Sequence, residues 1–514
     1  MNCQILATAL ALTAATAASA STNVIVFNSD PVPRSNNFFD FTLPTVALNN
    51  TGQIAFASDF EGPSGDNGAF IGSINGLLNV AQTGDVLPST LRVDDLISAG
   101  SAQPSINDVG QLGLKVTLDT ATNSNANDPA VLLGFSGGVT EVAAQGALTP
   151  TGQSLFFRTS QGVPINNAGR LVFSAGLFGT GVTSGTDEGI YRYDGVGNPF
   201  VEIVRKGQAT PDGTGTFTGT AFQASEAFAT PSLNASGSVV FVAGIDGSGV
   251  FDDQAVVRYD DNGGSGTLTE IARVGDVFTG GGSFRHLDFS VPLINDSGLV
   301  VFAASNDGTT SLDGVLTSDG TTTTAVAIAG QPILGVGTVG NVTGVVDLNN
   351  AGQVLFRSFG NSNFLNGILL ADSDGSVDSI ALEGALIPDG TGIFNTIGDY
   401  SLNESGQIAF TASVDFDPSD SITNDGSGLY LYDPDQGVIE ILREGDGFLG
   451  STITDFAFAG NVFDEFSGLN DLGQIAYSFS LADGRSGIAL ANVPEPSTAL
   501  LFLGAGFVAI RRRR

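Results

Sequence analysis

The chain has 514 residues, of which 53 are Asp or Glu and only 18 are Lys or Arg, giving a formal net charge of -35. Such an excess of negative charge repels phosphate backbones and anionic lipid, so nucleic acid is excluded as a partner class. The single Cys is Cys3 and the single His is His286, which leaves no Cys nucleophile, Cys-ligated zinc, disulfide framework or histidine-based zinc site in the folded part.

Residues 1–20 are predicted to form a secretory signal peptide. An apolar run from Ile5 to Ala17 is followed by Ala18, Ser19 and Ala20, small residues that suit a cleavage site after Ala20. The basic segment that usually opens such a signal is missing, because no Lys or Arg precedes Arg34. We therefore expect export, with a mature chain that begins at residue 21.

A nine-residue phrase, first seen from Leu48 to Phe56, recurs along the mature chain. Its eight copies carry Asn at positions 49, 107, 166, 234, 295, 349, 403 and 470, with spacings of 54 to 68 residues. This repeat is too regular for chance and too long for a leucine-rich or ankyrin array. Asn at the first position and Gly at the fourth are typical of a turn that closes a hairpin, so we interpret each Asn-x-x-Gly as a turn rather than a ligand site.

Each full repeat offers four strand-like runs. In the third repeat these are 171–174, 189–193, 201–205 and 228–233, and they alternate as antiparallel strands do. The run after each turn carries apolar residues on both of its faces, which predicts a sheet covered on both sides. A Gly-rich corner such as Gly84-Asp85 or Gly275-Asp276 follows the third run and is interpreted as strand termination.

The two ends of the array predict its topology. The eighth repeat supplies strands at 474–478 and 487–491 and then stops, whereas the mature chain opens with a matching third run, Val24 to Phe27, and continues with a strand from Phe38 to Leu48. The missing strand of the last sheet therefore lies at the beginning of the chain. We predict an all-β fold over residues 21–492: a β-propeller of eight four-stranded blades, closed by pairing of the N- and C-terminal strands.

The direction of the strands sorts the loops onto two ends of this propeller. The Asn-x-x-Gly turns share one end with the second-to-third hairpins, and both connections are mostly short. The longer, acidic loops, such as 59–68, 246–253 and 415–428, share the other end. We expect a binding site at that loop-rich end, because loops on a rigid scaffold commonly carry function.

Residues 493–514 form a separate segment. Val493-Pro494-Glu495-Pro496-Ser497 precedes an apolar stretch from Thr498 to Ile510, and four arginines follow, Arg511 to Arg514. The apolar stretch is shorter than the roughly 20 residues of a stable transmembrane helix, which favours a processed signal over a permanent anchor.

This tail resembles the PEP-CTERM sorting signal of Gram-negative bacteria that make extracellular polysaccharide. The resemblance implies transient insertion in the inner membrane and cleavage near Pro494, Glu495 and Pro496 by an exosortase-type membrane protease. It also implies delivery to the cell surface or the extracellular matrix. The Asn-x-x-Gly array in turn looks like the tandem-repeat group whose members carry interchangeable C-terminal anchors.

Two strings resemble a catalytic or a cofactor-binding motif, but neither has the neighbouring sequence that such a motif needs. His286 lies in a crossing between repeats and has no nucleophile-elbow motif beside it, so we expect an ordinary loop histidine. Residues 335–340 match the dinucleotide fingerprint as a string, but a strand rather than a helix is predicted to follow, so the match is accidental.

One loop is a candidate for calcium. Asp415, Asp417, Asp420 and Asp425 place carboxylates close together in the sequence, where hard oxygen ligands could gather the cation. The loop lacks the full EF-hand pattern, and the alternative is a solvated acidic loop. No other cofactor is predicted.

Two functions remain open. The first is a non-enzymatic surface or matrix protein for display or adhesion, with exopolysaccharide or other surface proteins as partners. The alternative is an extracellular carbohydrate-active enzyme that uses carboxylates at the loop-rich end. The absence of Trp, the single His and the near-uniform repeats favour the first.

Overall fold

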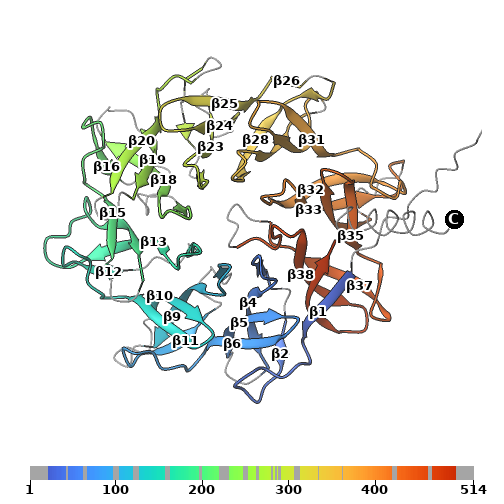
Figure 1. The fold of residues 1–514 in the computed structure, drawn as a ribbon, viewed down its shortest axis with the longest axis horizontal. Coiled ribbons are helices and arrows are strands. Elements are labelled where there is room, and N and C mark those ends of the chain that lie inside the picture. The colour runs from blue at the N-terminus through green and yellow to red at the C-terminus, as the bar shows by residue number, and fades with distance from the viewer. Residues whose placement is uncertain are drawn as a thin grey trace, which may run out of the picture.

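The computed structural model describes residues 21–493 apart from 42–43, 62–65, 97–103, 120–126, 157–161, 196–199, 219–230, 247–252, 262–265, 279–281, 284–285, 288–290, 306–312, 334, 362, 420–424 and 461–465. The elements named along this part of the chain are all strands. Eight of the sheets they form are arranged as the blades of a closed ring, and a ninth is a two-stranded hairpin (Figure 1). The predicted eight-bladed β-propeller is confirmed. The predicted signal peptide and the tail from residue 494 lie outside the described residues.

Blades 1 to 4 follow one another along the chain. Blade 1 contains β2 (Phe39–Asp40), β3 (Ala47–Leu48), β4 (Ile54–Phe60), β5 (Asn67–Ser73) and β6 (Gly76–Gln82). Blade 2 contains β7 (Arg92–Asp95), β8 (Ser105–Ile106), β9 (Leu112–Asp119), β10 (Asn127–Phe135) and β11 (Gly138–Ala144). Blade 3 contains β12 (Ser154–Phe156), β13 (Leu171–Phe178), β14 (Glu188–Tyr193) and β15 (Val201–Arg205). Blade 4 contains β16 (Thr216–Thr218), β17 (Ser232–Leu233), β18 (Val239–Asp246), β19 (Gln254–Asp260) and β20 (Thr267–Arg273).

Blades 5 to 8 complete the ring. Blade 5 contains β21 (His286–Leu287), β22 (Leu293–Ile294), β23 (Val300–Ser305), β24 (Gly314–Ser318) and β25 (Thr323–Ile328). The small hairpin of β26 (Pro332–Ile333) and β27 (Gly337–Thr338) precedes blade 6, which contains β28 (Asn341–Leu348), β29 (Val354–Phe359), β30 (Gly367–Ala371) and β31 (Val377–Leu382). Blade 7 contains β32 (Ile393–Leu402), β33 (Ile408–Asp415), β34 (Gly426–Asp433) and β35 (Gly437–Arg443). Blade 8 contains β36 (Gly447–Phe448), β37 (Ser451–Ala457), β38 (Gln474–Leu481), β39 (Ser486–Asn492) and β1 (Ser21–Phe27).

The first strand of four blades is less regular than the sequence predicts. The single strand expected from Phe38 to Leu48 consists of two short pieces, β2 and β3, which both pair with β4, and blades 2, 4 and 5 show the same break. A proline precedes the second piece in each of these blades, at Pro44, Pro104, Pro231 and Pro292. Proline has no backbone N–H to give to a ladder, so it interrupts the strand.

The predicted closure of the ring by both termini is confirmed. β1 pairs antiparallel with β39, from Ser21 opposite Asn492 to Phe27 opposite Gly487. The pairing contains a one-residue bulge at Ile25, and the last pair of strands in each of the other seven blades has a bulge at the equivalent place. β1 therefore takes the outer-strand position of blade 8 with the geometry of a regular member of the repeat.

The hydrophobic core consists of layers between adjacent blades rather than one central cluster. Eight buried clusters lie at the eight boundaries, and each draws residues from two neighbouring blades. In β4, Ile54 and Phe56 pack toward blade 8, whereas Ala55 packs toward blade 2. Val26 of β1 belongs to the layer between blades 8 and 1, so the predicted two-sided packing is confirmed and includes the closing strand.

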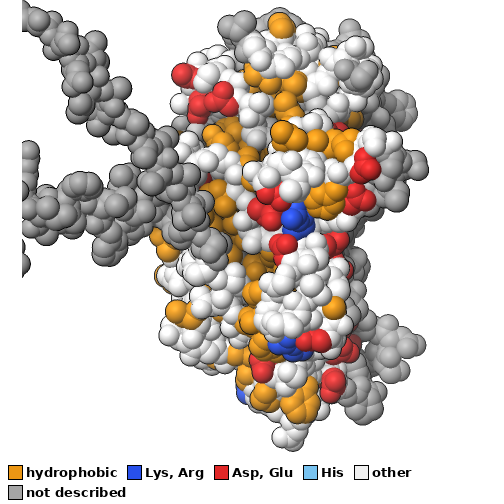
Figure 2. Space-filling model, turned by 90° about the vertical axis from the view of Figure 1, so that its right-hand side faces the viewer, with side chains coloured by type: hydrophobic (Ala, Val, Ile, Leu, Met, Phe, Trp, Pro, Cys, Tyr) orange, Lys and Arg blue, Asp and Glu red, His pale blue; other side chains and the backbone are white. Residues whose placement is uncertain are grey.

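The ring has two distinct ends. Ile54, which follows the first Asn-x-x-Gly turn, lies opposite Gly72, which precedes the β5–β6 hairpin, so turns and hairpins share one end as predicted. We call this the turn end and the opposite one the loop end. The outer side between them carries scattered acidic side chains with few Lys or Arg (Figure 2). In the part of the chain that the structure covers, no helix has the length and apolar character needed to cross a bilayer.

Candidate functional site

The eight turn asparagines form a closed ring of hydrogen bonds at the turn end. Each donates from its side-chain Nδ2 to the backbone carbonyl of the asparagine in the next turn, over distances of 2.8 to 3.2 Å. The circuit runs from Asn49 through Asn107, Asn166, Asn234, Asn295, Asn349, Asn403 and Asn470 back to Asn49. Each turn is therefore bonded to its neighbour, and the last is bonded to the first.

The same side chains also close their own turns. The Oδ1 atom of Asn403 accepts from the backbone N–H groups of Ser405, at 3.0 Å, and Gln407, at 2.8 Å. Its Nδ2 also donates to the Gln407 side-chain oxygen at 2.9 Å. The amide thus uses both donors and both acceptor positions within the protein. The interpretation of Asn-x-x-Gly as a turn is confirmed.

The link between repeats was missed by the sequence reasoning, although a signal for it exists. Asp closes such a turn as readily as Asn, since only the side-chain oxygen is needed. The ring additionally needs an N–H donor, which a carboxylate lacks. All eight positions carry Asn and none carries Asp.

The residues after the asparagines form a second polar ring. Asp108 accepts from the backbone N–H of Asn50 at 2.8 Å, and Asp471 accepts from that of Glu404 at 3.0 Å. Asn50 in turn accepts from the Asp471 N–H at 2.8 Å, so this ring also joins the last blade to the first. Ala235 occupies this position in blade 4 and has no side-chain oxygen to continue the pattern.

Together the two rings line a cavity of about 250 Å³ on the axis at the turn end. The aliphatic residues that precede each asparagine, Leu48 and Ile106 among them, also contribute to its wall. The lining includes four acidic residues, Asp108, Asp296, Glu404 and Asp471, and no Lys or Arg. Burial, with Asp471 and Asp296 nearby, raises the pKa of Glu404. The cavity therefore suits cationic or neutral polar groups and disfavours anions.

Phe466 connects blades that are not neighbours. It belongs to the chain of blade 8, yet it packs in the apolar layer of blades 5 and 6. A Cβ atom on Gly162, which leads into blade 3, would come within 2.8 Å of the Phe466 Cζ atom, so an alanine there would need the ring to move. Contacts with these separate parts of the ring place Phe466 across the axis.

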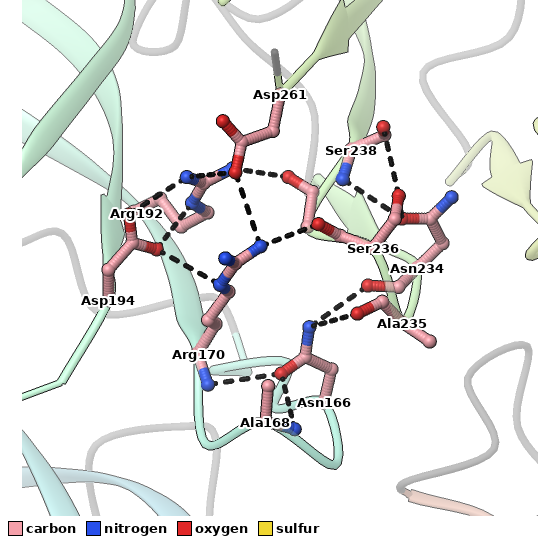
Figure 3. Close-up of polar contacts among 11 residues, drawn as sticks. Asn166, Ala168, Arg170, Arg192, Asp194, Asn234, Ala235, Ser236, Ser238 and Asp261 are labelled. Atoms are coloured by element: carbon pink, nitrogen blue, oxygen red, sulfur yellow. Dashed lines mark hydrogen bonds and ion pairs between the residues drawn. The ribbon is translucent and has the colours of Figure 1, made fainter. Parts of the chain in front are cut away.

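A cluster of two arginines and two aspartates joins blades 3 and 4 near the turn end (Figure 3). Arg192 of β14 is 2% exposed and donates to Asp194 at 2.7 and 2.8 Å, to Asp261 at 2.9 Å and to the Gly237 carbonyl. Arg170 follows the blade 3 turn and contacts Asp261 at 3.2 Å and the Ser236 carbonyl at 2.5 Å. Two positive and two negative charges balance each other, so the cluster is a charged staple between blades.

This staple was also missed by the sequence reasoning, which treated the repeats as near-uniform. Arg192 occupies a strand position where blade 7 has the buried Leu431. Blade 4 carries Arg258 at the matching place, and it donates to the Gly298 carbonyl of the next blade at 2.9 Å. The strings Arg192-Tyr193-Asp194 and Arg258-Tyr259-Asp260 were the available signal.

Further clusters of charged side chains lie on the outer strands of blades 4 and 7. Arg273 of β20 contacts Asp253 at 2.6 Å and Asp212 at 3.2 Å, and burial together with Asp212 raises the pKa of the adjacent Glu270 to about 7. In blade 7, burial likewise raises the pKa of Glu440 beside Arg443. The same Glu and Arg pair, three residues apart, occurs in blades 3, 4 and 7, which points to a repeated structural contact.

The predicted calcium loop is described in part. Asp415 ends β33 and its Oδ1 accepts from the Asp417 N–H at 3.0 Å, while Asp425 accepts from the Phe416 N–H at 2.8 Å. Asp420 lies outside the described residues. Among the residues that are described, no group of three or more His, Cys, Asp or Glu side chains is placed to hold a metal ion. Calcium at this loop stays a prediction.

The remaining predicted sites divide between described and undescribed parts. His286, which we expected in a loop, instead begins strand β21, because its backbone pairs with Ser305 of β23. The dinucleotide-like string is followed by strand β28, so the strand predicted at this place is confirmed. The signal-cleavage residues Ala18 and Ala20 and the sorting residues Pro494, Glu495 and Pro496 lie outside the described residues.

Comparison with solved structures finds propellers of low sequence identity. A puromycin-hydrolysing peptidase of Mycobacterium tuberculosis is 10% identical with a TM-score of 0.39, over 89% of this chain and 62% of that one. The propeller domain of the Trilobed protease from Pyrococcus furiosus is 9% identical with a TM-score of 0.37, over 79% of this chain and 100% of that one. Dipeptidyl peptidase 4 of Porphyromonas gingivalis is 11% identical with a TM-score of 0.44, over 87% of this chain and 57% of that one. This chain thus spans less than two thirds of the length of the first and third proteins, and the likeness concerns the fold alone.

Sequence comparisons identify the two parts of the chain. A search of curated proteins gives no match. Residues 492–514 match the PEP-CTERM protein-sorting motif, which confirms the predicted tail and supports export and sorting to the surface of a Gram-negative bacterium. The likeness of the repeats to the group with interchangeable anchors stays a prediction. Residues 48–500 match the family described as a family of unknown function, DUF7453, and the chain belongs to that family.

Proposed function

We propose that this protein is an exported surface or matrix protein whose closed propeller serves display or adhesion, without a catalytic role. An exosortase-type protease removes its tail. The observation that carries the proposal is the combination of a sorting motif at residues 492–514 with a ring whose turns are bonded to one another all the way round.

The ring supports a platform role because it limits relative motion of the blades. Every boundary has an apolar layer, and the turn end adds a side-chain-to-backbone hydrogen bond at each boundary. A rigid scaffold presents loops at fixed spacing, which lowers the entropy lost when a partner binds. The loops at the loop end would then carry the contacts with exopolysaccharide or other surface proteins.

The charge of the protein limits its partners. A net charge of -35 disfavours strongly anionic polymers and favours neutral or cationic ones. Neutral exopolysaccharides and cationic regions of other surface proteins therefore fit best.

The sorting part of the proposal is tested by expression in a Gram-negative host with and without its exosortase. We expect a tail-free extracellular form in the first host and an uncleaved membrane-bound form in the second. Replacing Glu495 by Ala should block cleavage in the first host, whereas Asp483→Ala, on an exposed turn of blade 8, should not. Equal processing of all three proteins in both hosts would refute exosortase processing.

The binding part is tested by applying the processed protein to a glycan array. Saturable binding to neutral glycans, weakened by substitutions at the loop end and retained by substitutions at the turn end, is the expected result. Binding restricted to polyanions would contradict the charge argument.

One observation favours the alternative function, an extracellular carbohydrate-active enzyme. Burial raises the pKa of Glu270 to about 7, so this carboxyl could hold a proton at neutral pH as a general acid does, with Asp212 and Asp253 nearby. Release of reducing ends from a panel of neutral and acidic glycans, lost in Glu270→Gln, would establish this function and displace our proposal.

A further inference from the structure

Both ends of the folded ring leave from the turn end. Asn492, the last residue of β39, lies opposite Gln474, the first residue after the blade 8 turn, and opposite Ser21, the first residue of β1. The Gln474 side chain also donates to the Asn492 Oδ1 atom at 2.6 Å. The chain therefore enters the sorting tail beside the Asn-x-x-Gly turn of blade 8.

The tether between the propeller and the apolar part of the tail is short. Only residues 493–497 separate Asn492 from Thr498, where the apolar stretch begins. Five residues span at most roughly 18 Å even when fully extended. The turn end of blade 8 consequently cannot lie far from the point at which the tail enters a bilayer.

The turn end also has exposed aliphatic side chains around this exit. Leu472 in blade 8, Ile74 in blade 1 and Val109 in blade 2 are 57%, 69% and 66% exposed. Leu472 and Val109 occupy the third position of their turns, where the other six turns carry Thr, Ala or Ser. Three neighbouring blades around the exit therefore present apolar side chains, accompanied by Asp108 and Asp471.

We infer that the turn end faces the lipid surface while the tail is in place, and that the loop end is displayed away from the membrane. The partner of the turn end is a neutral lipid headgroup layer, because its acidic ring repels anionic lipid. A membrane protease that cuts near residues 494–496 must then approach the ring across blades 8, 1 and 2. This inference rests on the proposed sorting function and adds an orientation to it.

The two ends of β6 offer a matched pair of positions to test this orientation. Ile74 lies in the hairpin that precedes β6 and Val86 in the corner that follows it, and they are 69% and 59% exposed. Seven strand residues separate the two ends by roughly 23 Å. Cys3 is the only native thiol, so Ile74→Cys and Val86→Cys can each be labelled specifically in a Cys3→Ser background.

The tail-bearing protein is reconstituted into phosphatidylcholine vesicles that contain an acceptor dye on a fraction of the headgroups. We expect energy transfer from a donor at position 74 to exceed that from position 86 several-fold. A flexible insert of twelve Gly and Ser residues after Val493 should abolish most of this difference, as the tether would no longer fix the ring near the surface.

The outcomes separate the inference from the function on which it rests. Equal transfer from both positions, or greater transfer from position 86, in protein that sediments with the vesicles overturns the orientation alone. Failure of the tail-bearing protein to sediment with vesicles overturns both the tail's role and the orientation.

Discussion

The side-chain amide of Asn470 donates to the backbone carbonyl of Asn49 at 3.0 Å, although 421 positions separate the two residues. This bond completes the ring at the axis, while the pairing of β1 with β39 completes blade 8 at its outer edge. The beginning and the end of the folded chain are thus held together at two places, one near the axis and one at the outer edge of blade 8. The fold is closed by specific contacts and does not depend on the apolar layers alone.

Asn349 tests whether the ring adds to the turns. Asn349→Ala should destabilise the protein by about 1–3 kcal/mol, since it leaves the Gln353 N–H without a partner and the Asn403 carbonyl with only the Gly406 N–H. Asn349→Asp keeps the oxygen that closes the turn but loses the donor to Asn403, so it should also lower the melting temperature clearly. Ala351→Ser, at an exposed position of the same turn, is the control and should melt as the native protein does. Native melting of Asn349→Asp would show that only the local turn matters.

The staple between blades 3 and 4 should be sensitive to loss of one partner. Arg192→Leu removes the buried cation from Asp194 and Asp261 and leaves only Arg170 beside them, at a cost of about 2–3 kcal/mol. Arg485→Ala removes a similar pair with Asp483 at an exposed site and should leave chemical denaturation unchanged. Equal midpoints for the two variants would contradict the staple.

Asp347 should make stability depend on pH. Its carboxylate is buried at the boundary of blades 6 and 7, where it accepts from the N–H groups of Leu402 and Leu348 at 2.8 Å. Burial raises its pKa from 3.8 to about 7, so the folded protein keeps a proton that the unfolded chain releases. The stability from this group is complete below its unfolded pKa of 3.8 and is lost as pH rises through about 7.

Asp347→Asn removes the titration and keeps one of the two oxygens that accept from Leu402 and Leu348, so any loss from the second hydrogen bond is the same at every pH. We expect the melting temperature of the native protein to fall relative to this variant as pH rises across that window. A difference that stays constant with pH, or that grows on acidification, would show that Asp347 does not carry this dependence.

The calcium prediction has a direct test in titration calorimetry. Calcium added to tail-free protein should release or absorb heat that the Asp417→Ala variant lacks. Asp483→Ala changes an exposed aspartate elsewhere and serves as the control. Equal null heats for native and Asp417→Ala protein would remove calcium from this loop.

The sequence was sufficient for the architecture because the repeat sets it locally. Alternating strands, turn residues and the third run at Val24 to Phe27 each carry a pattern within a few positions, and β1 pairs as that pattern requires. The contacts between repeats were less accessible. The partner of Asn49 lies in the next turn, Phe466 crosses the axis, and Arg192 stands where blade 7 has an apolar residue.

We predicted a binding site at the loop end, whereas the cavity described above lies at the turn end. The cavity formed by all eight turns lies at the turn end, because the closed ring brings together residues that are far apart in sequence. Loop lengths indicate which end is variable, but they do not show which end is hollow. The displayed loops and the axial cavity are therefore separate surfaces for separate tests.

Thermal unfolding of protein that lacks residues 21–27 tests the circular closure most directly. Removing β1 exposes the edge of β39 and strips Val26 from the layer between blades 8 and 1, so the account predicts a large fall in melting temperature, together with an expanded shape in solution scattering. An unchanged melting temperature and an unchanged radius of gyration would contradict closure by the two termini.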